Sequence, residues 1–135
     1  MLRGPFSLAT SSMLLGMPTE WSEGIVLCDL GDEPELSEEI AALVEQLKAT
    51  PVPKIPSVVL NFGGVSYLNS SHIASLLRVR KRVAEGKRSM VLASMSDEVW
   101  SIMLMTGLDK IFETAPDTMT ALARVQLAGG EKPEG

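Results

Sequence analysis

The stretch Val58-Val59-Leu60-Asn61-Phe62-Gly63-Gly64-Val65-Ser66-Tyr67-Leu68-Asn69-Ser70-Ser71-His72 decides the fold, because an apolar run ends there in a polar turn. Four β-compatible residues come first, and we interpret the Gly63-Gly64 pair after them as a turn. Apolar residues then recur at helical spacing, at Ile73, Leu76 and Leu77. The pattern predicts a strand, a loop and a helix in that order.

The start of this helix is the most informative site in the sequence. Asn69 is the predicted N-cap, because its side-chain oxygen can accept from the amide of a residue two or three positions on. Ser70 and Ser71 then fall in the first turn, where backbone amides lack helical partners. A phosphoryl group attached there would find hydrogen-bond donors waiting.

Strands and helices alternate along the rest of the chain. The apolar patterns predict strands at 25–30 and 89–93 and helices at 34–49, 70–85, 97–105 and 118–127. Gly86 is expected to end the second helix and Gly107 the third. Strands separated by helices indicate an α/β domain with a largely parallel sheet under helical cover.

The two ends of the chain differ from this pattern. Residues 1–20 are expected to form an N-terminal arm, part of which (8–15) pairs at a sheet edge while the rest is disordered. Residues 21–127 are the predicted domain, and the polar segment 128–135 is a predicted flexible tail. Hydroxyl residues, Gly4 and Pro5 interrupt the first apolar region, so we predict neither a signal peptide nor membrane insertion.

Composition excludes several classes of function. A net charge of -5 over 135 residues argues against nucleic-acid binding, which needs a basic surface. Cys28 is the single cysteine and lies in an apolar run, so we expect a buried thiol rather than a disulfide.

His72 follows Ser70 by two helical positions, and their side chains diverge by about 200 degrees, too far for a nucleophile and its base. No metal-ligand spacing or phosphate-binding loop occurs, so we predict a non-enzyme without metal or cofactor.

The predicted helix at 97–105 is apolar over too much of its circumference for a solvated helix. Val99, Ile102 and Met103 make a core stripe, while Trp100, Leu104 and Met105 point elsewhere. Either the last helix or the N-terminal arm covers this second face, or the face docks a partner protein. Our candidate partner-binding residues are Trp100, Met103, Leu104 and Arg78.

Arg78 belongs to a basic cluster in this otherwise acidic chain. The cluster lies along the later half of the helix that starts at Ser70 and continues past its end, and it comprises Arg78, Arg80, Lys81, Arg82, Lys87 and Arg88. One explanation is that it complements the negative end of the helix dipole. The other is a charge contact with an acidic partner.

Three separated motifs carry a family resemblance. The segment Leu60 to Leu77, then Met90-Val91-Leu92-Ala93-Ser94-Met95-Ser96, then Met105-Thr106-Gly107-Leu108-Asp109-Lys110-Ile111-Phe112, resembles the STAS domain of bacterial anti-sigma factor antagonists. The signature of that family is Asp-Ser-Ser/Thr-Gly-Leu at a strand-to-helix junction, with Thr/Ser-Gly-Leu and Phe later. The resemblance covers residues 24–125 and implies a mixed, mostly parallel sheet of about four or five strands with about four helices.

The resemblance also implies a function. In such proteins an anti-sigma factor that is also a serine kinase phosphorylates the first signature serine, and the phosphate blocks binding to that partner. The corresponding residue is Ser70, with Ser71 as the alternative, in a switch loop that includes Asn69 and His72. A cytoplasmic regulator of transcription, monomeric or weakly dimeric, is implied. Asn69 and His72 replace the signature aspartate and glycine, and we expect the imidazole to crowd a kinase active site.

A second class of function is compatible with the same resemblance. Isolated domains of this family also serve as scaffolds in signalling assemblies and as accessory subunits of lipid-transport complexes. In those settings partner binding matters and phosphorylation is not required.

Overall fold

Strand β3 (Ser57–Gly64) is the centre of the sheet. The computed structural model describes the backbone of residues 19–22 and 24–130, and the side chains of residues 24–127. Within these residues the strands lie in the order β1-β2-β3-β4-β5. β2 (Ile25–Gly31), β4 (Met90–Ala93) and β5 (Glu113–Ala115) run parallel to β3, and β1 (Thr19–Ser22) pairs antiparallel with β2.

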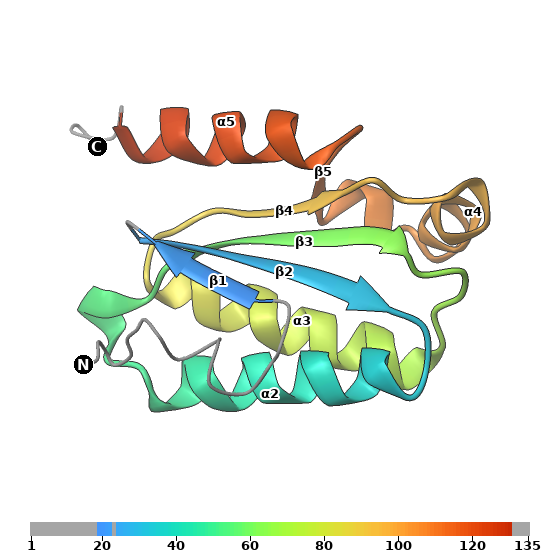
Figure 1. Cartoon of the computed structure of the whole chain (residues 1–135), viewed down its shortest axis with the longest axis horizontal. Coiled ribbons are helices and arrows are strands. Elements are labelled where there is room, and N and C mark those ends of the chain that lie inside the picture. Colours follow the sequence, from blue (N-terminus) through green and yellow to red (C-terminus); the bar gives the residue numbers. More distant parts are fainter. Residues whose placement is uncertain (1–18, 23, 131–135) are drawn as a thin grey trace.

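Helices cover both faces of the sheet. α2 (Glu35–Ala49) and α3 (Ser70–Glu85) lie side by side along one face, and α5 (Thr118–Gly130) covers the other (Figure 1). α4 (Asp97–Thr106) lies beyond the end of the sheet toward which β3 points (Figure 1). Two short 3-10 turns, η1 (Val52–Lys54) and η2 (Leu108–Lys110), complete the order of elements. The predicted α/β fold with a mostly parallel sheet is confirmed.

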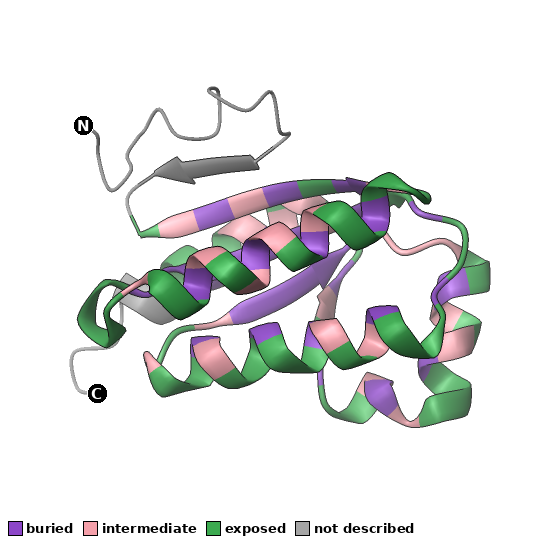
Figure 2. Ribbon diagram, turned by 90° about the horizontal axis from the view of Figure 1, so that it is seen from below, coloured by how far each residue is buried: buried purple, intermediate pink, exposed green. Residues whose placement is uncertain are grey.

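Burial follows the predicted periodicities. β3 is buried at nearly every position from Ser57 to Phe62, as expected for a parallel strand covered on both faces. On α2 and α3 the buried residues form one inward stripe and the outer face is exposed (Figure 2). Small residues on the opposite side of the sheet, such as Ala93 and Ala115, pack against Ala121 of α5. Cys28 is buried as predicted.

The structure corrects the interpretation of Gly63 and Gly64. We predicted a turn, but both residues extend β3, and Gly64 pairs with Gly31 beyond an irregularity in the β2–β3 register. A Cβ at Gly64 would lie only 3.0 Å from the carbonyl oxygen of Leu30. Glycine is therefore explained at Gly64 by a close approach of two backbones, and no turn is needed.

The helix ends match the sequence signals closely. α2 begins one residue after the predicted position, with Pro34 as its N-cap, and α4 ends at Thr106 with Gly107 as its C-cap, at a φ of 77°. Only glycine adopts this left-handed conformation without strain. α5 continues three residues beyond its predicted end, so the first residues of the predicted tail are helical.

The observed edge strand is β1. The segment 8–15 that we expected at the sheet edge lies outside the described residues, as does 131–135. Among the helices of the described part of the chain, none combines the length and the apolar character that a bilayer crossing requires.

Candidate functional site

The candidate site is the start of α3, where Asn69 caps the helix as predicted. The Asn69 side-chain oxygen accepts from the His72 amide at 3.0 Å, and the Asn69 amide donates to Nδ1 of His72 at 3.0 Å. This is a reciprocal capping box with histidine in the place that glutamate or glutamine usually takes. An aspartate at Asn69 could accept the same bond, so the substitution removes a negative charge and keeps the cap.

Both serines are exposed at the first two positions of the helix. Within residues 24–127, no hydrogen bond occupies the hydroxyl or the amide of Ser70 or Ser71, and the first bond of the helix runs from Ile73 to the carbonyl of Asn69. The first turn of α3 also contains no acidic residue. Two free N–H groups therefore lie beside two free hydroxyls, at the positive end of a helix of 16 residues.

His72 lies in the interior, contrary to our expectation that it would crowd a partner. Only 3% of the residue is exposed, and its Nε2 lies 2.7 Å from Oε2 of Glu33. Because the Asn69 amide can only donate, Nδ1 must accept, and the proton of the neutral ring is on Nε2 and points at Glu33. The histidine therefore ties the start of α3 to the loop before α2.

Glu33 is held by three donors. It accepts from the Ser37 amide at 3.0 Å and the Ser37 hydroxyl at 2.5 Å, as well as from His72. The Ser37 hydroxyl, then the His72 ring and the Ser37 amide, lower the pKa of Glu33 to about 2. The carboxylate is thus ionised, and its charge is fixed beside the helix start.

A second bridge joins the same two loops. Asp32 accepts from the Ser66 amide and the Ser66 hydroxyl, both at 2.8 Å. These two bonds lower the pKa of Asp32 below its ordinary value. The loop from β2 to α2 and the loop from β3 to α3 therefore behave as one connected surface at the carboxyl end of the sheet.

The group Ser37, His72 and Glu33 is not a catalytic triad. In a triad the acid binds one ring nitrogen and the nucleophile the other, whereas here both Glu33 and Ser37 lie at Nε2. The Ser37 hydroxyl donates its proton to Glu33, and Nδ1 is occupied by the backbone. The arrangement positions a helix and leaves no base to activate a serine.

The predicted partner-binding residues divide into separate places. The prediction that Met103 contacts a partner was wrong, because its side chain is fully buried in the core below α4. Leu104 is 51% exposed, and Trp100 is half-buried beside a hollow of about 220 Å³ lined also by Met95, Thr114, Ala115 and Pro116. The residues beside Trp100 thus belong to β5 and to the segment that follows it, and not to the last helix that we expected there.

Arg78 lies apart from Trp100, in a groove between α2 and α3. The structure does not bring the four candidates into one pocket. Ser70, Ser71 and Leu104 remain as exposed positions on α3 and α4.

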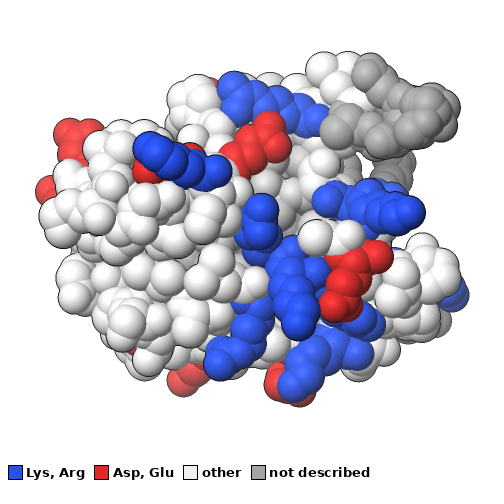
Figure 3. Space-filling view, turned by 180° about the vertical axis from the view of Figure 1, so that it is seen from behind, with Lys and Arg blue, Asp and Glu red and all other residues white. Residues whose placement is uncertain are grey.

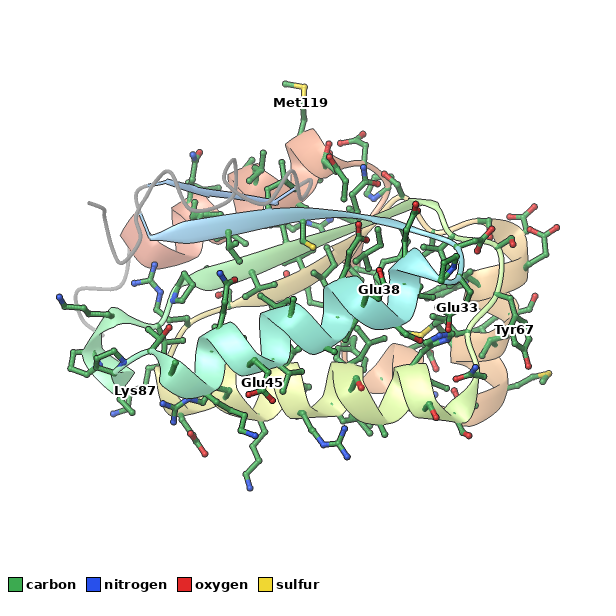
Figure 4. All side chains as sticks on the ribbon, turned by 60° about the horizontal axis from the view of Figure 1, so that its bottom comes forward. Glu33, Glu38, Glu45, Tyr67, Lys87 and Met119 are labelled. Atoms are coloured by element: carbon green, nitrogen blue, oxygen red, sulfur yellow. The ribbon has the colours of Figure 1, made fainter. Side chains whose placement is uncertain are left out.

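The sequence analysis missed several participants at the site. Glu33 and Ser37 have no local signal, since Glu33 lies 39 positions from His72 along the chain. Tyr67 is 61% exposed, points away from the domain, and lies at the same end of the molecule as Glu33, opposite Lys87 (Figure 4). An aromatic residue three positions before Ser70, in a predicted loop, was a signal that could have been used.

Comparison with known proteins gives a family and a fold. The sequence profile of the STAS domain matches residues 25–121. A STAS domain protein of Planctomyces limnophilus described as an anti-sigma factor antagonist has 18% identity and a TM-score of 0.62, over 78% of this chain and 94% of that one. A candidate anti-sigma factor antagonist of Thermotoga maritima has 14% identity and a TM-score of 0.68, over 82% and 95%.

These structures are similar in fold, and the profile match extends over most of the chain, from the first parallel strand into α5. The helix start at Asn69 and Ser70 lies within the residues that the profile matches. The chain belongs to the STAS domain family.

Proposed function

We propose that this chain is a non-catalytic partner-switching regulator, an anti-sigma factor antagonist that binds an anti-sigma factor with serine kinase activity. In this proposal the chain acts in the cytoplasm, binds while Ser70 is unmodified, and is released when Ser70 is phosphorylated. The observation that carries the proposal is the exposed Ser70 hydroxyl beside two unpaired amides at a rigidly capped helix start.

The proposed switch acts by charge and bulk. Phosphoserine adds nearly two negative charges, and a partner carboxylate about 5 Å away would be repelled by several kcal/mol before solvent screening. A loss of roughly 2.7 kcal/mol is enough to weaken binding a hundredfold. Exposed Leu104, together with Tyr67, supplies apolar area near this end of the domain for the unmodified complex.

The test is phosphorylation by the cognate kinase, followed by intact-mass analysis and peptide mapping. We expect one phosphoryl group on Ser70, none on Ser70→Ala, and one on the matched control Ser71→Ala. Binding measured by calorimetry should fall about a hundredfold after modification. Tight binding without any phosphorylation would reject the switch and identify a constitutive scaffold or accessory subunit instead.

A further inference from the structure

A groove between α2 and α3 lies apart from the start of α3. It encloses about 410 Å³, and it is lined by Val44, Leu47, Lys48, Arg78, Val79, Lys81, Arg82 and Glu85. Its floor is apolar, with Val44 half-buried and Leu47 and Val79 buried. Its rim contains Lys48, Arg78, Lys81 and Arg82, and Lys and Arg side chains gather on the face of the molecule seen in Figure 3.

Arg82 has a structural role in this groove. Its Nε donates to the carbonyl of Leu47 at 3.0 Å, one Nη donates to the carbonyl of Thr50 at 2.8 Å, and the other pairs with Glu85 at 2.7 Å. The guanidinium thus satisfies the last carbonyls of α2, and Glu85 neutralises it. Arg82 is not available to a ligand.

Arg78 and Lys81 are different. Both are exposed, and within residues 24–127 neither forms a hydrogen bond or an ion pair. Lys48, on the opposite wall, is 3.5 Å from Glu45, but both side chains are well exposed and such a pair is weak. A chain of net charge -5 therefore presents an apolar groove with uncommitted cations along its wall.

We propose that this groove is a docking surface for an acidic amphipathic helix of a partner protein. Two neighbouring helices form a natural seat for a third, whose apolar side chains pack on Val44 while its carboxylates face Arg78 and Lys81. Arg78 lies about 12 Å along the axis of α3 from Ser70. The surface goes beyond the proposed switch, because occupation of it requires no modified serine.

The shape of the groove favours a helix over a bilayer. Membrane-surface binding requires apolar side chains that project into the lipid, whereas here the apolar residues form the floor. The exposed cations alone would hold an anionic surface by about 1 kcal/mol each. A helix that enters the groove uses both the floor and the wall.

The test is fluorescence anisotropy with a labelled synthetic peptide. The peptide is an amphipathic helix of about 16 residues, long enough to span roughly 24 Å, with leucine on one face and glutamate on both flanks. We expect saturable binding in the micromolar range to the full chain, and at least tenfold weaker binding to Arg78→Glu/Lys81→Glu. A scrambled peptide of the same composition should bind at least tenfold more weakly.

Two variants separate docking from general charge attraction. Lys54→Glu/Lys110→Glu makes the same change in net charge at exposed lysines outside the groove lining, and it should keep binding within twofold. Val44→Lys adds a positive charge but places a longer side chain in the groove. We expect Val44→Lys to bind the peptide at least fivefold more weakly, whereas pure charge attraction would make binding tighter; circular dichroism checks that each variant is folded.

Two results would overturn the proposal. The first is equal binding of the amphipathic peptide and its scrambled version. The second is no binding of the amphipathic peptide to the unmodified chain, and association of that chain with phosphatidylglycerol-containing vesicles that depends on Arg78 and Lys81 would then identify a membrane as the occupant instead. Neither result depends on whether a kinase modifies Ser70.

Discussion

At the scale of single residues, His72 explains how the start of α3 is fixed. Its two ring nitrogens join the start of α3 to a second loop, since Nδ1 accepts from the amide of the N-cap Asn69 and Nε2 binds Glu33 from the loop before α2. A glycine, which the family signature has at this position, could make neither bond. The buried imidazole therefore holds the start of α3 in place through two hydrogen bonds, as a tether. Ser70, two positions earlier, stays exposed.

The tether predicts a particular dependence of stability on pH. The pKa of Glu33 is lowered from 4.5 to about 2 in the fold, so its ionised form stabilises the folded state at pH values above 4.5. That contribution is lost as the pH falls from 4.5 toward 2. We expect Glu33→Gln to lower the free energy of unfolding at neutral pH, and the difference from the unmodified chain to shrink across this acidic range, as measured by urea denaturation at several pH values.

The matched control is Glu45→Gln, which changes an exposed glutamate of α2 whose one ion pair within residues 24–127 is with Lys48. Its difference from the unmodified chain should be small throughout. A Glu33→Gln difference that stays constant from neutral pH to pH 2 would show that the carboxylate charge is not what the fold uses.

At the scale of elements, the C-terminal end of α2 depends on a side chain of α3. Arg82 donates to the carbonyls of Leu47 and Thr50, while Thr50 donates back through its own hydroxyl to the carbonyl of Gln46. The Leu47 carbonyl also accepts from the Thr50 amide at 3.2 Å, so Arg82 adds a second donor there and supplies a side-chain donor to Thr50 at the helix end. The two helices therefore form a unit that shares one arginine.

This shared arginine predicts that Arg82 and its neighbour Lys81 contribute differently to stability. Arg82→Ala should destabilise the domain by about 1–3 kcal/mol, because two charge-assisted bonds to the end of α2 are lost. Arg82→Lys should recover only part of this, since a lysine cannot reach both carbonyls with one planar group. Urea unfolding measures both, and amide exchange near Leu47 should accelerate in Arg82→Ala.

Lys81→Ala is the control for that series. Lys81 is exposed and contacts no described side chain through a hydrogen bond, so its substitution should change stability by less than about 0.5 kcal/mol. Equal losses for the two variants would mean that the stability of the α2–α3 unit comes from diffuse charge instead of the bonds to α2.

Local signals in the sequence predicted the elements well. The cap at Asn69 and the glycine at Gly107 are recognised from neighbouring residues alone, and both are confirmed. Gly63 and Gly64 were misassigned because the reason for glycine at Gly64 is the backbone of a neighbouring strand, which no local pattern reveals. Met103 satisfied two patterns at once, core spacing and interface composition, and only the packing of α4 decides between them.

At the scale of the whole molecule, the fold keeps the candidate switch apart from the groove. Ser70 begins α3 at the carboxyl end of the sheet, while Arg78 and Lys81 lie further along the same helix. The Glu33 and Asp32 bridges that frame the first site join residues more than 30 positions apart. These long-range contacts could not be predicted from the sequence, although the residue types and the parallel topology that allow them could.

The exposed and capped start of α3 predicts that phosphorylation of Ser70 leaves the domain folded as before. The added phosphate faces solvent and two unpaired amides, where an anion stabilises a helix start by about 0.3–1 kcal/mol. The capping box and the tether through His72 already fix this turn, so no rearrangement is needed to accommodate the group. Comparison of phosphorylated and unmodified protein by urea unfolding should give free energies of unfolding within about 1 kcal/mol of each other, with amide exchange in β3 and β4 unchanged.

Ser71→Glu serves as a control for charge at the neighbouring position. If phosphorylation instead unfolds α3, seen as lost exchange protection along the helix, then release of the partner would follow from a change of fold rather than from charge at a fixed surface.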